Sequence, residues 1–377
     1  MNFRFSAEKV QKQSGDFLLI SLVILLGGIG LAMLFSSSYY YGELRFQDPL
    51  YFVKRQAGKV LFGAFLAFGV SRINMAAVKK FVPALLLSAL LLCVLTFVPG
   101  IGREIMGARR WIFIGPQSFQ PSELAKLAVI LYLAYIFSKK EDRLNDFVRS
   151  VFPPLLIIFL FIALIYLQND FSTALFIFVL SLIIFFIARI KVIYFLLLGA
   201  VGVPLSVVLI FTKEHRVLRI LSFLNPELDP VGAGYQIKAA QEALARGGLW
   251  GVGLGEGTKK LGGLPEAHSD FVFAVLGEEM GFIGILFILS LFIAFAFRGY
   301  QIAVKSSDSF GYYCAFGITT CILFQALLNI AVVSGLVPTT GIPLPFFSSG
   351  GSSILMTLVM CGFLVNLSRQ NIKEGNR

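Results

Sequence analysis

The chain has 377 residues and a net charge of +11, yet only 14% of its residues are charged and 57% are hydrophobic. Soluble domains carry roughly a quarter charged residues, so the composition excludes an ordinary soluble protein. Apolar runs of about 20 residues recur along the chain, and helices of that length cross the ~30 Å hydrocarbon layer of a bilayer. The runs lack the alternation of membrane β-strands. We therefore predict an all-α polytopic membrane protein.

In chain order, a polar and basic segment over residues 1–16 precedes ten predicted transmembrane helices. The first apolar run is too long for a cleavable signal peptide and lacks a small-residue cleavage pattern, so we expect it to remain as a helix. The second is the weakest, because Lys54, Arg55 and Lys59 crowd its start. We expect one membrane domain over residues 1–377, with spans at 17–37, 52–70, 81–98, 120–137, 151–168, 171–188, 192–212, 270–297, 310–335 and 348–367.

Basic residues favour the loops on the side of the two termini. An even number of spans puts both termini on one side of the membrane. Short cytoplasmic loops carry an excess of Lys and Arg, so both termini are predicted to be cytoplasmic. The positive net charge then reports topology and does not imply nucleic-acid binding. The residues on this side are Arg72, Lys79, Lys80, Lys139, Lys140, Arg143, Arg149, Arg189, Lys191, Arg298 and Lys305, with Arg4, Lys9, Lys12, Arg369, Lys373 and Arg377 in the tails.

Two predicted outer loops are basic against this rule. Long translocated loops tolerate charge, so one interpretation is ordinary surface charge. The other is an anion site on the outer face, because Arg and Lys are the usual phosphate ligands. The loop 99–119 and the large extracytoplasmic loop 213–269, between the seventh and eighth spans, contain Arg103, Arg109, Arg110, Lys213, Arg216, Arg219, Lys238, Arg246, Lys259 and Lys260.

The large loop carries a helix signal followed by a glycine-rich stretch. Residues 236–246 have helical spacing of apolar residues and stop at Gly247 and Gly248, which predicts a helix lying flat on the outer surface. Residues 247–260 contain neither the Walker order nor a dinucleotide fingerprint, so we expect no nucleotide cofactor. The stretch is either a flexible turn or a pliable loop whose amides approach an anionic headgroup.

An ionisable cluster lies where the eighth span begins. Glu266, His268 and Asp270 come within five residues, and the chain is then apolar to residue 297 except for Glu278 and Glu279. Residue 269 (Ser) or Asp270 is the predicted N-cap of that helix. We interpret the remainder of the chain as the frame that presents this cluster.

Other polar residues near the spans have structural explanations. Glu123 and Lys126 are three apart on one helix face, which favours an ion pair that pins two helices over a direct chemical role. Asp170 can cap the sixth span. Trp111 can pack on lipid or sugar, although an interfacial anchor is the commoner role. No metal-type spacing links the cysteines, which we expect to be packed thiols: Cys93, Cys314, Cys321 and Cys361.

Four ordered motifs resemble the SEDS family (shape, elongation, division and sporulation), which includes FtsW, RodA and SpoVE. Residues 109–112 read Arg-Arg-Trp-Ile, and residues 119–126 read Phe-Gln-Pro-Ser-Glu-Leu-Ala-Lys. Residues 264–271 read Leu-Pro-Glu-Ala-His-Ser-Asp-Phe, and residues 338–346 are followed by a Ser- and Gly-rich stretch. The 265–268 context looks closest to the division or sporulation branch. Small departures from the family pattern occur at Asn169, Ser172, Ser269 and Ser349.

The resemblance implies a peptidoglycan glycosyltransferase in the bacterial cytoplasmic membrane. Such proteins polymerise lipid II, a disaccharide-pentapeptide on undecaprenyl pyrophosphate, at the outer face during division or septal and cell-shape wall synthesis. It also implies a class B penicillin-binding protein and other division proteins as partners. The family's essential aspartate corresponds to Asp270.

The chemistry of that reaction fits the residues. A sugar hydroxyl needs a general base, and Asp270 is the candidate for an inverting transfer. The leaving pyrophosphate is already anionic and needs cations rather than an acid. Its predicted ligands act directly or beside a divalent cation, Mg²⁺ or Mn²⁺. The predicted substrate-binding residues are Arg109, Arg110, Trp111, Glu123, Lys126, Lys259, Lys260 and His268.

Two other functions stay open at this stage. A lipid II flippase would be expected to show interrupted helices and midplane charges in matching halves. The sequence shows no convincing internal repeat, and its charges cluster at the predicted outer face. The second alternative is a non-catalytic scaffold of the division machinery.

Overall fold

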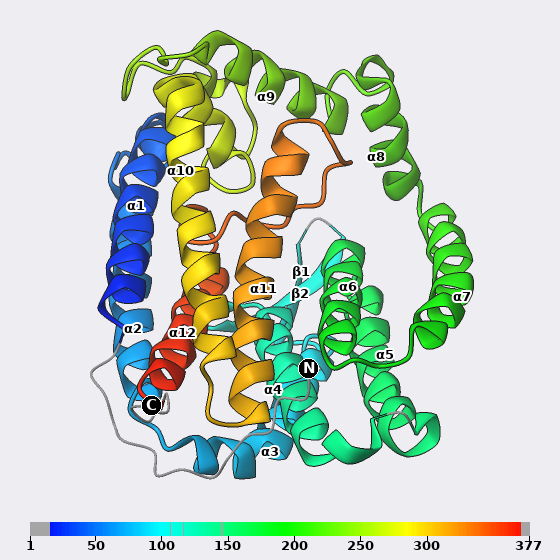
Figure 1. Cartoon of the computed structure of the whole chain (residues 1–377). Coiled ribbons are helices and arrows are strands. Elements are labelled where there is room, and N and C mark those ends of the chain that lie inside the picture. Colours follow the sequence, from blue (N-terminus) through cyan, green and yellow to red (C-terminus); the bar gives the residue numbers. More distant parts are fainter. Residues whose placement is uncertain (1–15, 106, 116, 145, 371–377) are drawn as a thin grey trace.

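The computed structural model describes residues 16–370 except 106, 116 and 145, and it is a helical bundle with one small sheet (Figure 1). The helices are α1 (Phe17–Phe46), α2 (Tyr51–Val70), α3 (Met75–Leu95), α4 (Pro121–Lys139), α5 (Phe152–Leu167), α6 (Phe171–Ile187), α7 (Val192–Phe211), α8 (Glu214–Leu224), α9 (Ala233–Gly247), α10 (Val272–Val304), α11 (Ser309–Val333) and α12 (Gly351–Ser368). Short helical turns cover Glu141–Arg143, Phe147–Val151, Pro226–Leu228 and Lys259–Gly263.

Eight of the described helices are long and apolar enough to cross a membrane. They confirm the prediction of a polytopic helical membrane protein. The other two predicted spans also fall on helices. One is α2, which has 20 residues and carries Lys54, Arg55 and Lys59, and the other is α6, which has 17 residues.

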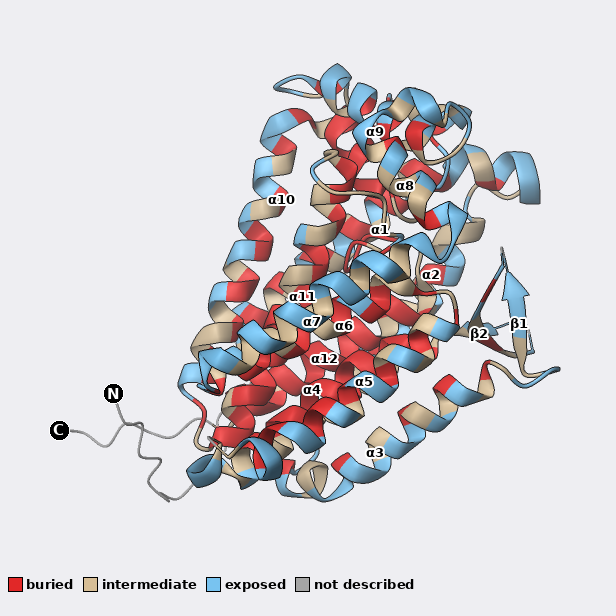
Figure 2. Cartoon of the chain, turned by 90° about the vertical axis from the view of Figure 1, so that its right-hand side faces the viewer, coloured by how far each residue is buried: buried red, intermediate tan, exposed pale blue. Residues whose placement is uncertain are grey.

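The helices differ sharply in how much protein covers them. In the most apolar 18-residue segment of α12, 89% of the residues are buried, and in that of α4 the share is 72%. In α7 no residue is buried. Figure 2 shows the buried residues concentrated in the middle of the bundle, around α4, α11 and α12. The apolar surface of α7 thus faces away from the protein core, as suits a helix in contact with lipid.

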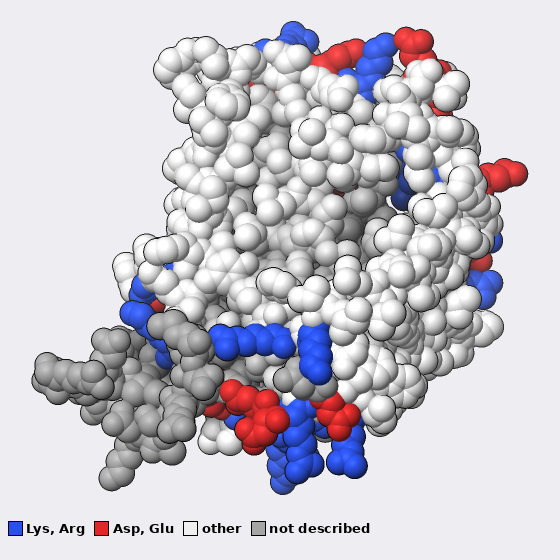
Figure 3. Space-filling view, turned by 45° about the vertical axis from the view of Figure 1, so that its right-hand side comes forward, with Lys and Arg blue, Asp and Glu red and all other residues white. Residues whose placement is uncertain are grey.

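The described ends of the chain meet at one end of the bundle. The Asp16 amide donates to Ser368 Oγ over 3.1 Å, and Arg298 Nε lies 2.6 Å from Asp16 Oδ2. We call the opposite end, where α8 and α9 lie, the distal end (Figure 1). Figure 3 shows charged residues gathered toward the two ends of one face, with a largely uncharged belt between them. The predicted topology residues Arg4, Lys9, Lys12, Lys373 and Arg377 lie outside the described residues.

The loop 99–119 forms an antiparallel sheet that the sequence reasoning did not predict. Its strands are β1 (Gly102–Ile105), β2 (Ala108–Ile114) and β3 (Gln117–Phe119), in the order β1-β2-β3. Arg103 pairs with Trp111 across the first ladder. Glycines at 107 and 115 with φ of 73° and 61° make the two turns. The prediction of an all-α protein is therefore right for the membrane part and wrong for this loop.

The predicted surface helix in the large loop is α9. It runs across the distal end above α10 and α11 (Figure 1) and buries Ile237, Ala240 and Ala243. It ends at Gly247, and Gly248 takes a φ of 51°, as is common where a helix stops.

The glycine-rich stretch after α9 docks on a break in α10. Gly281 has a φ of 65° inside that helix, so the helical hydrogen bonds around it are interrupted. The stretch supplies replacements, because the amides of Val252 and Gly253 donate to the carbonyls of Glu278 and Glu279 at 3.0 and 3.1 Å. The amides of residues 282 and 283 donate back to the carbonyls of 248 and 249. The stretch is therefore a bonded part of the fold, and the flexible-turn interpretation is wrong.

Helix α10 starts later than the sequence predicts. Its N-cap is Phe271, without a side-chain hydrogen bond, and Asp270 lies in the preceding turn. Glu266 has a φ of 56°, and its carbonyl accepts from the amides of Ser269 and Phe271 at 3.0 and 3.3 Å. This turn displaces the predicted cap at Ser269 or Asp270. In contrast, Asp170 caps α6 as predicted, accepting from the amide of Thr173.

Candidate active site

A polar cavity of about 570 Å³ lies at the distal end of the bundle. Asp270 and Glu266 enter it from the turn before α10, and Arg110 enters from β2. Helix α8 contributes His215 and Arg219. The loop between α11 and α12 closes one side through residues 339–342. Four segments far apart in the sequence thus meet around one carboxylate.

Asp270 is half-buried, and its position is fixed by a hydrogen bond to its backbone carbonyl. Asn329 Nδ2 donates to the carbonyls of Asp270 and Ile342, both at 2.9 Å, which ties the turn to the α11–α12 loop. Among the described residues, no hydrogen bond reaches the carboxylate oxygens themselves. Gly341 approaches them, since a Cβ on it would lie 3.5 Å from Oδ2. The carboxylate is therefore fixed in place and free to accept a proton.

Opposing effects set the pKa of Asp270 to about 6. Burial is the largest cause that raises it, and the charge of Glu266 adds to this effect. The cations Arg219 and Arg110 act in the other direction. At neutral pH the carboxylate is then largely ionised, and it is a stronger base than an ordinary aspartate, which suits a general base.

Arginines form the cationic side of the cavity. Arg110 Nη1 lies 3.8 Å from Asp170 Oδ1, and the same guanidinium donates to the carbonyl of Asn169. Burial and the charge of Arg110 lower the pKa of Arg219. Burial and then the charge of Arg219 lower the pKa of His215, so that imidazole is neutral at pH 7. Arg110 and Arg219 thus bring two positive charges to a cavity that Asp229, Glu266 and Asp270 also line.

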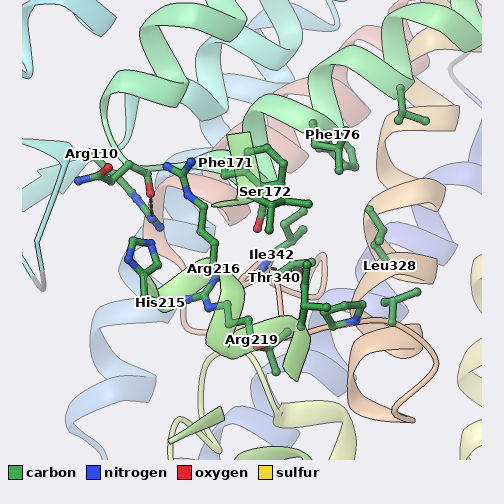
Figure 4. Close-up of a pocket in the computed structure, with 18 of the residues that line it drawn as sticks. Arg110, Phe171, Ser172, Phe176, His215, Arg216, Arg219, Leu328, Thr340 and Ile342 are labelled. Carbon is green, nitrogen blue, oxygen red and sulfur yellow. Dashed lines mark hydrogen bonds between the residues drawn. The ribbon is translucent and has the colours of Figure 1, made fainter. Parts of the chain in front are cut away.

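A second cavity of about 360 Å³ adjoins the first and is mostly apolar. The two share Arg110, His215 and Arg219, together with residues 339, 340 and 342 of the α11–α12 loop. Figure 4 shows the basic residues at one end of this cavity and Phe176 and Leu328 toward the other. A ligand with an anionic head and an apolar tail would match both ends.

Comparison with known proteins places this geometry in a family. Residues 16–373 match the model of the FtsW/RodA/SpoVE family, described as a cell cycle protein. The chain belongs to the FtsW/RodA/SpoVE family. A relative from Geobacter sp. (strain M18), named probable peptidoglycan glycosyltransferase FtsW, is 43% identical over 354 residues, covering 94% of this chain and 96% of the relative. Stage V sporulation protein E of Bacillus subtilis (strain 168) is 39% identical over 359 residues, covering 95% and 98%.

Solved structures of FtsW/RodA/SpoVE relatives share the fold. One chain, from work described as structural coordination of polymerization and crosslinking by a peptidoglycan synthase complex, has a TM-score of 0.79 and 28% identity. The alignment covers 96% of this chain and 99% of that one. The rod shape determining protein RodA of Thermus thermophilus has a TM-score of 0.68 and 25% identity, covering 96% and 98%. The predicted family and the predicted multi-pass membrane class are thus confirmed.

The Arg-Arg-Trp motif of this FtsW/RodA/SpoVE protein is split by the strand that carries it. Neighbouring side chains of a strand point to opposite faces, which separates Arg109 from Arg110. Arg110 lines both cavities, and Trp111 lines the polar one. Arg109 is exposed, pairs with Glu104 at 3.1 Å, and lies against a different, smaller pocket. The structure therefore brings Arg110 and Trp111 to Asp270, but not Arg109.

The two lysines predicted to hold pyrophosphate are engaged elsewhere. Lys260 is buried and lies 2.6 Å from Glu279, while its Nζ also donates to Ser36. Lys259 pairs with Glu242 at 2.5 Å. Neither lysine lines the described cavities around Asp270, because each neutralises a carboxylate of the packed distal end.

Glu123 and Lys126 form the buried ion pair that the sequence favoured. Lys126 Nζ lies 2.8 Å from Glu123 and donates to Gln325 Oε1 at 2.8 Å. Gln325 in turn donates to the carbonyl of Pro343 at 3.0 Å, in the loop that borders Asp270. The pair thus supports the α11–α12 loop through Gln325 and does not line the polar cavity.

His268 supports the catalytic turn through its ring and backbone. The ring stacks on Tyr41 with centroids 5.2 Å apart and tilts against Phe52 at 4.6 Å. Its carbonyl accepts from the amide of Ser349. The imidazole is not among the residues that line the polar cavity.

The sequence reasoning overlooked four residues of the site. Arg216 and Arg219 were counted among the outer-loop cations but were not selected as ligands, and His215 and Asn329 were not considered. The helical spacing of His215 and Arg219, four apart on one face of α8, was the available signal. For Asn329 no signal existed, since its partners are backbone carbonyls brought close only by the fold.

The described carboxylates do not form a protein site for the predicted divalent cation. In the part of the chain that the structure describes, no group of three or more His, Cys, Asp and Glu side chains could hold a metal ion. The arginines are therefore the positive groups that the site itself offers to a phosphate.

Proposed function

We propose that this FtsW/RodA/SpoVE protein polymerises lipid II into glycan strands at the outer face of the bacterial cytoplasmic membrane, with Asp270 as the general base. Its activity as a peptidoglycan glycosyltransferase accords with its family and the names of its relatives. The observation that supports the mechanism best is the unbonded Asp270 carboxylate in a cavity that Arg110 and Arg219 also line.

The proposed reaction is a single displacement. Asp270 takes the proton of the acceptor sugar hydroxyl as its oxygen attacks the anomeric carbon of the donor. The bond between that carbon and the pyrophosphate oxygen breaks, and the electron pair leaves with the pyrophosphate. Arg110 and Arg219 balance the charge that develops there. Attack from the side opposite the leaving group inverts the anomeric configuration.

The proposed topology has ten transmembrane helices and both termini in the cytoplasm. The ten predicted spans fall on ten helices, and the described ends of the chain meet at one end of the bundle. The cation-rich loops between spans favour that end as the cytoplasmic side. The polar cavity, at the distal end, would then open on the outer side, where lipid-linked sugars are polymerised.

Partners and cofactors remain part of the proposal. A class B penicillin-binding protein would crosslink the strands, and other division proteins would localise the enzyme. The similarity to a chain of a peptidoglycan synthase complex supports such a pairing. A divalent cation, Mg²⁺ or Mn²⁺, is kept as a proposal that chelation would test, because the described side chains supply no ligand set for it.

The flippase and scaffold alternatives have less support. A flippase needs a polar path near the midplane, whereas Lys126 and Glu123 form a buried ion pair in which Lys126 also donates to Gln325. A scaffold would not require an ionised, unbonded carboxylate facing arginines.

The decisive experiment is polymerisation of lipid II by the purified chain with its partner and a divalent cation. Wild type should form glycan polymer, and Asp270→Asn should reduce the rate by about 10²–10⁴-fold, the usual contribution of a general base. Glu266→Gln, which changes a second carboxylate of the same cavity, is the matched control and should retain most activity. Polymer from Asp270→Asn at the wild-type rate would remove Asp270 as the base. Transfer of lipid II across vesicles without polymer would favour the flippase.

A further inference from the structure

The apolar cavity ends at a buried arginine that lacks a counter-charge. Arg216, on α8, is 6% exposed and lines the cavity opposite its apolar walls. Its guanidinium lies over the ring of Tyr166, with 4.5 Å to the centroid, and over Phe171 at 5.3 Å. Aromatic faces hold the guanidinium in place, but they do not supply hydrogen-bond acceptors.

Part of the hydrogen-bonding capacity of Arg216 is unused. Its Nη1 donates to the carbonyl of Leu209 at 2.9 Å and more weakly to Thr212. Its Nε and Nη2 have no partner among the described residues. The Nε of Arg110, at the same end of the cavity, is also unsatisfied. Buried donors of a charged group are costly to leave unpaired, so these N–H groups indicate a missing anionic acceptor.

The other buried cations of the described chain show how unusual this is. Lys126 and Lys260 are as buried as Arg216, and each lies within 2.8 Å of a glutamate. The described ion pairs include none for Arg216. Figure 4 shows Arg216 with Arg110 and Arg219 at one end of the apolar cavity, and Arg110 and Arg219 also line the polar one.

We infer that Arg216 and the apolar cavity bind the polyprenyl pyrophosphate of the glycosyl donor. The pyrophosphate accepts hydrogen bonds from Arg216, Arg110 and Arg219, and the first isoprenoid units lie between α6 and α11 against Phe176 and Leu328. This inference rests on the proposed glycosyl transfer, because it assigns the leaving group of that reaction to one side of the site.

This assignment orders the two substrates. The arginines shared by both cavities place the pyrophosphate at their junction, so the donor sugar projects into the polar cavity toward Asp270. The acceptor must then approach through the polar cavity and does not occupy the apolar one. Arg216 is therefore a specificity residue for the donor, and it distinguishes a pyrophosphate lipid from a neutral lipid.

The test measures ligand binding, which does not require catalysis. The probe is farnesyl pyrophosphate, a short polyprenyl pyrophosphate without sugar, added to the purified full-length chain in detergent. Arg216→Gln should weaken its binding by about tenfold or more, the value of a charge-assisted hydrogen bond. Lys238→Gln, which removes an exposed cation on α9 away from both cavities, is the matched control and should bind as wild type does.

Additional ligands separate the head from the tail. Farnesol and inorganic pyrophosphate should each bind more weakly than farnesyl pyrophosphate. Leu328→Trp, which fills the apolar end of the cavity, should weaken the binding of farnesyl pyrophosphate but leave that of inorganic pyrophosphate unchanged. If Arg216→Gln fails to fold, Leu328→Trp still tests whether the apolar cavity binds the probe. Equal binding of inorganic and farnesyl pyrophosphate, or displacement of farnesyl pyrophosphate by phosphatidylglycerol at similar concentration, would overturn the inference.

The outcome is separable from that of the proposed function. If wild type polymerises lipid II but Arg216→Gln and Leu328→Trp both bind the probe unchanged, the inference fails and the function stands. If wild type makes no polymer but probe binding depends on Arg216, the binding site stands and the function fails.

Discussion

Two ionic clusters at the distal end use the same residue types in opposite ways. In the first, Glu278 and Glu279 are fully buried and accept hydrogen bonds from the 258–260 segment, with Lys260 paired to Glu279 at 2.6 Å. In the second, Asp270 and Arg216 keep carboxylate oxygens or N–H groups without partners among the described residues. In the first cluster the charges are paired and hold the chain together. In the second, the Asp270 carboxylate and the Nε and Nη2 groups of Arg216 are available to a substrate.

The largest effect should come from breaking the buried pair of Lys260 and Glu279. Glu279→Gln leaves Lys260 buried without a counter-charge, which typically costs about 3–5 kcal/mol. We expect a clearly lower Tm of the detergent-solubilised protein. The matched variant Glu279→Gln with Lys260→Met removes both charges and should recover much of the loss. A Tm of Glu279→Gln equal to that of wild type would contradict the comparison, as would a double variant less stable than the single one.

A smaller effect should separate two adjacent arginines. Arg110 lines both cavities and Arg109 faces away, pairing with Glu104 on the surface. Arg110→Gln should lower kcat/KM for lipid II about 10–100-fold, the value of one or two charge-assisted contacts to a phosphate. Arg109→Gln should change it by less than about twofold, because exposed pairs contribute little. Similar losses of kcat/KM in both variants would contradict the placement of Arg110 in the site and of Arg109 outside it.

The smallest effect should appear in the pH dependence of the rate. A base must be ionised, so activity should fall as pH drops through the Asp270 pKa of about 6. Arg219 lowers that pKa, so Arg219→Gln should move the acidic limb of the kcat/KM profile to higher pH. Glu266→Gln should move it to lower pH, since Glu266 raises the pKa. Limbs that stay in place in both variants would mean that another group controls the profile.

The same pKa has a stability consequence of defined sign. The folded-state pKa of Asp270 is raised from its ordinary value of 3.8, so folding favours the protonated form. The contribution of this group to stability is then fully present below pH 3.8 and is lost as pH rises through about 6.

The membrane helices could be predicted because they depend on composition and length alone. All ten predicted spans fall on helices, and eight of the described helices are long and apolar enough to cross a membrane. The sheet over 102–119 could not be predicted in the same way. Its strands are short and carry charged residues, as a surface loop does. That sheet decides which of Arg109 and Arg110 reaches the site.

Sequence reasoning identified the carboxylate but misplaced most of its surroundings. Asp270 was found from its family motif and from its position before an apolar run. Its predicted use as a helix cap was wrong, because the Glu266 carbonyl takes over the local hydrogen bonds. The lysines at 259 and 260 were chosen for their charge, yet their partners Glu242 and Glu279 meet them only in the fold. Counting charges cannot tell a neutralised cation from an available one.

The interruption at Gly281 bears on how the site responds to its surroundings. Bending of a long helix passes along its continuous hydrogen bonds, and α10 has a φ of 65° where they stop. The segment before Gly281 is instead fastened to the stretch 248–253 and to Asn329 through Asp270. Changes in tilt that a thicker or thinner bilayer imposes on the lower part of α10 should therefore reach the carboxylate only weakly. The enzyme would keep its geometry across membranes of different lipid composition.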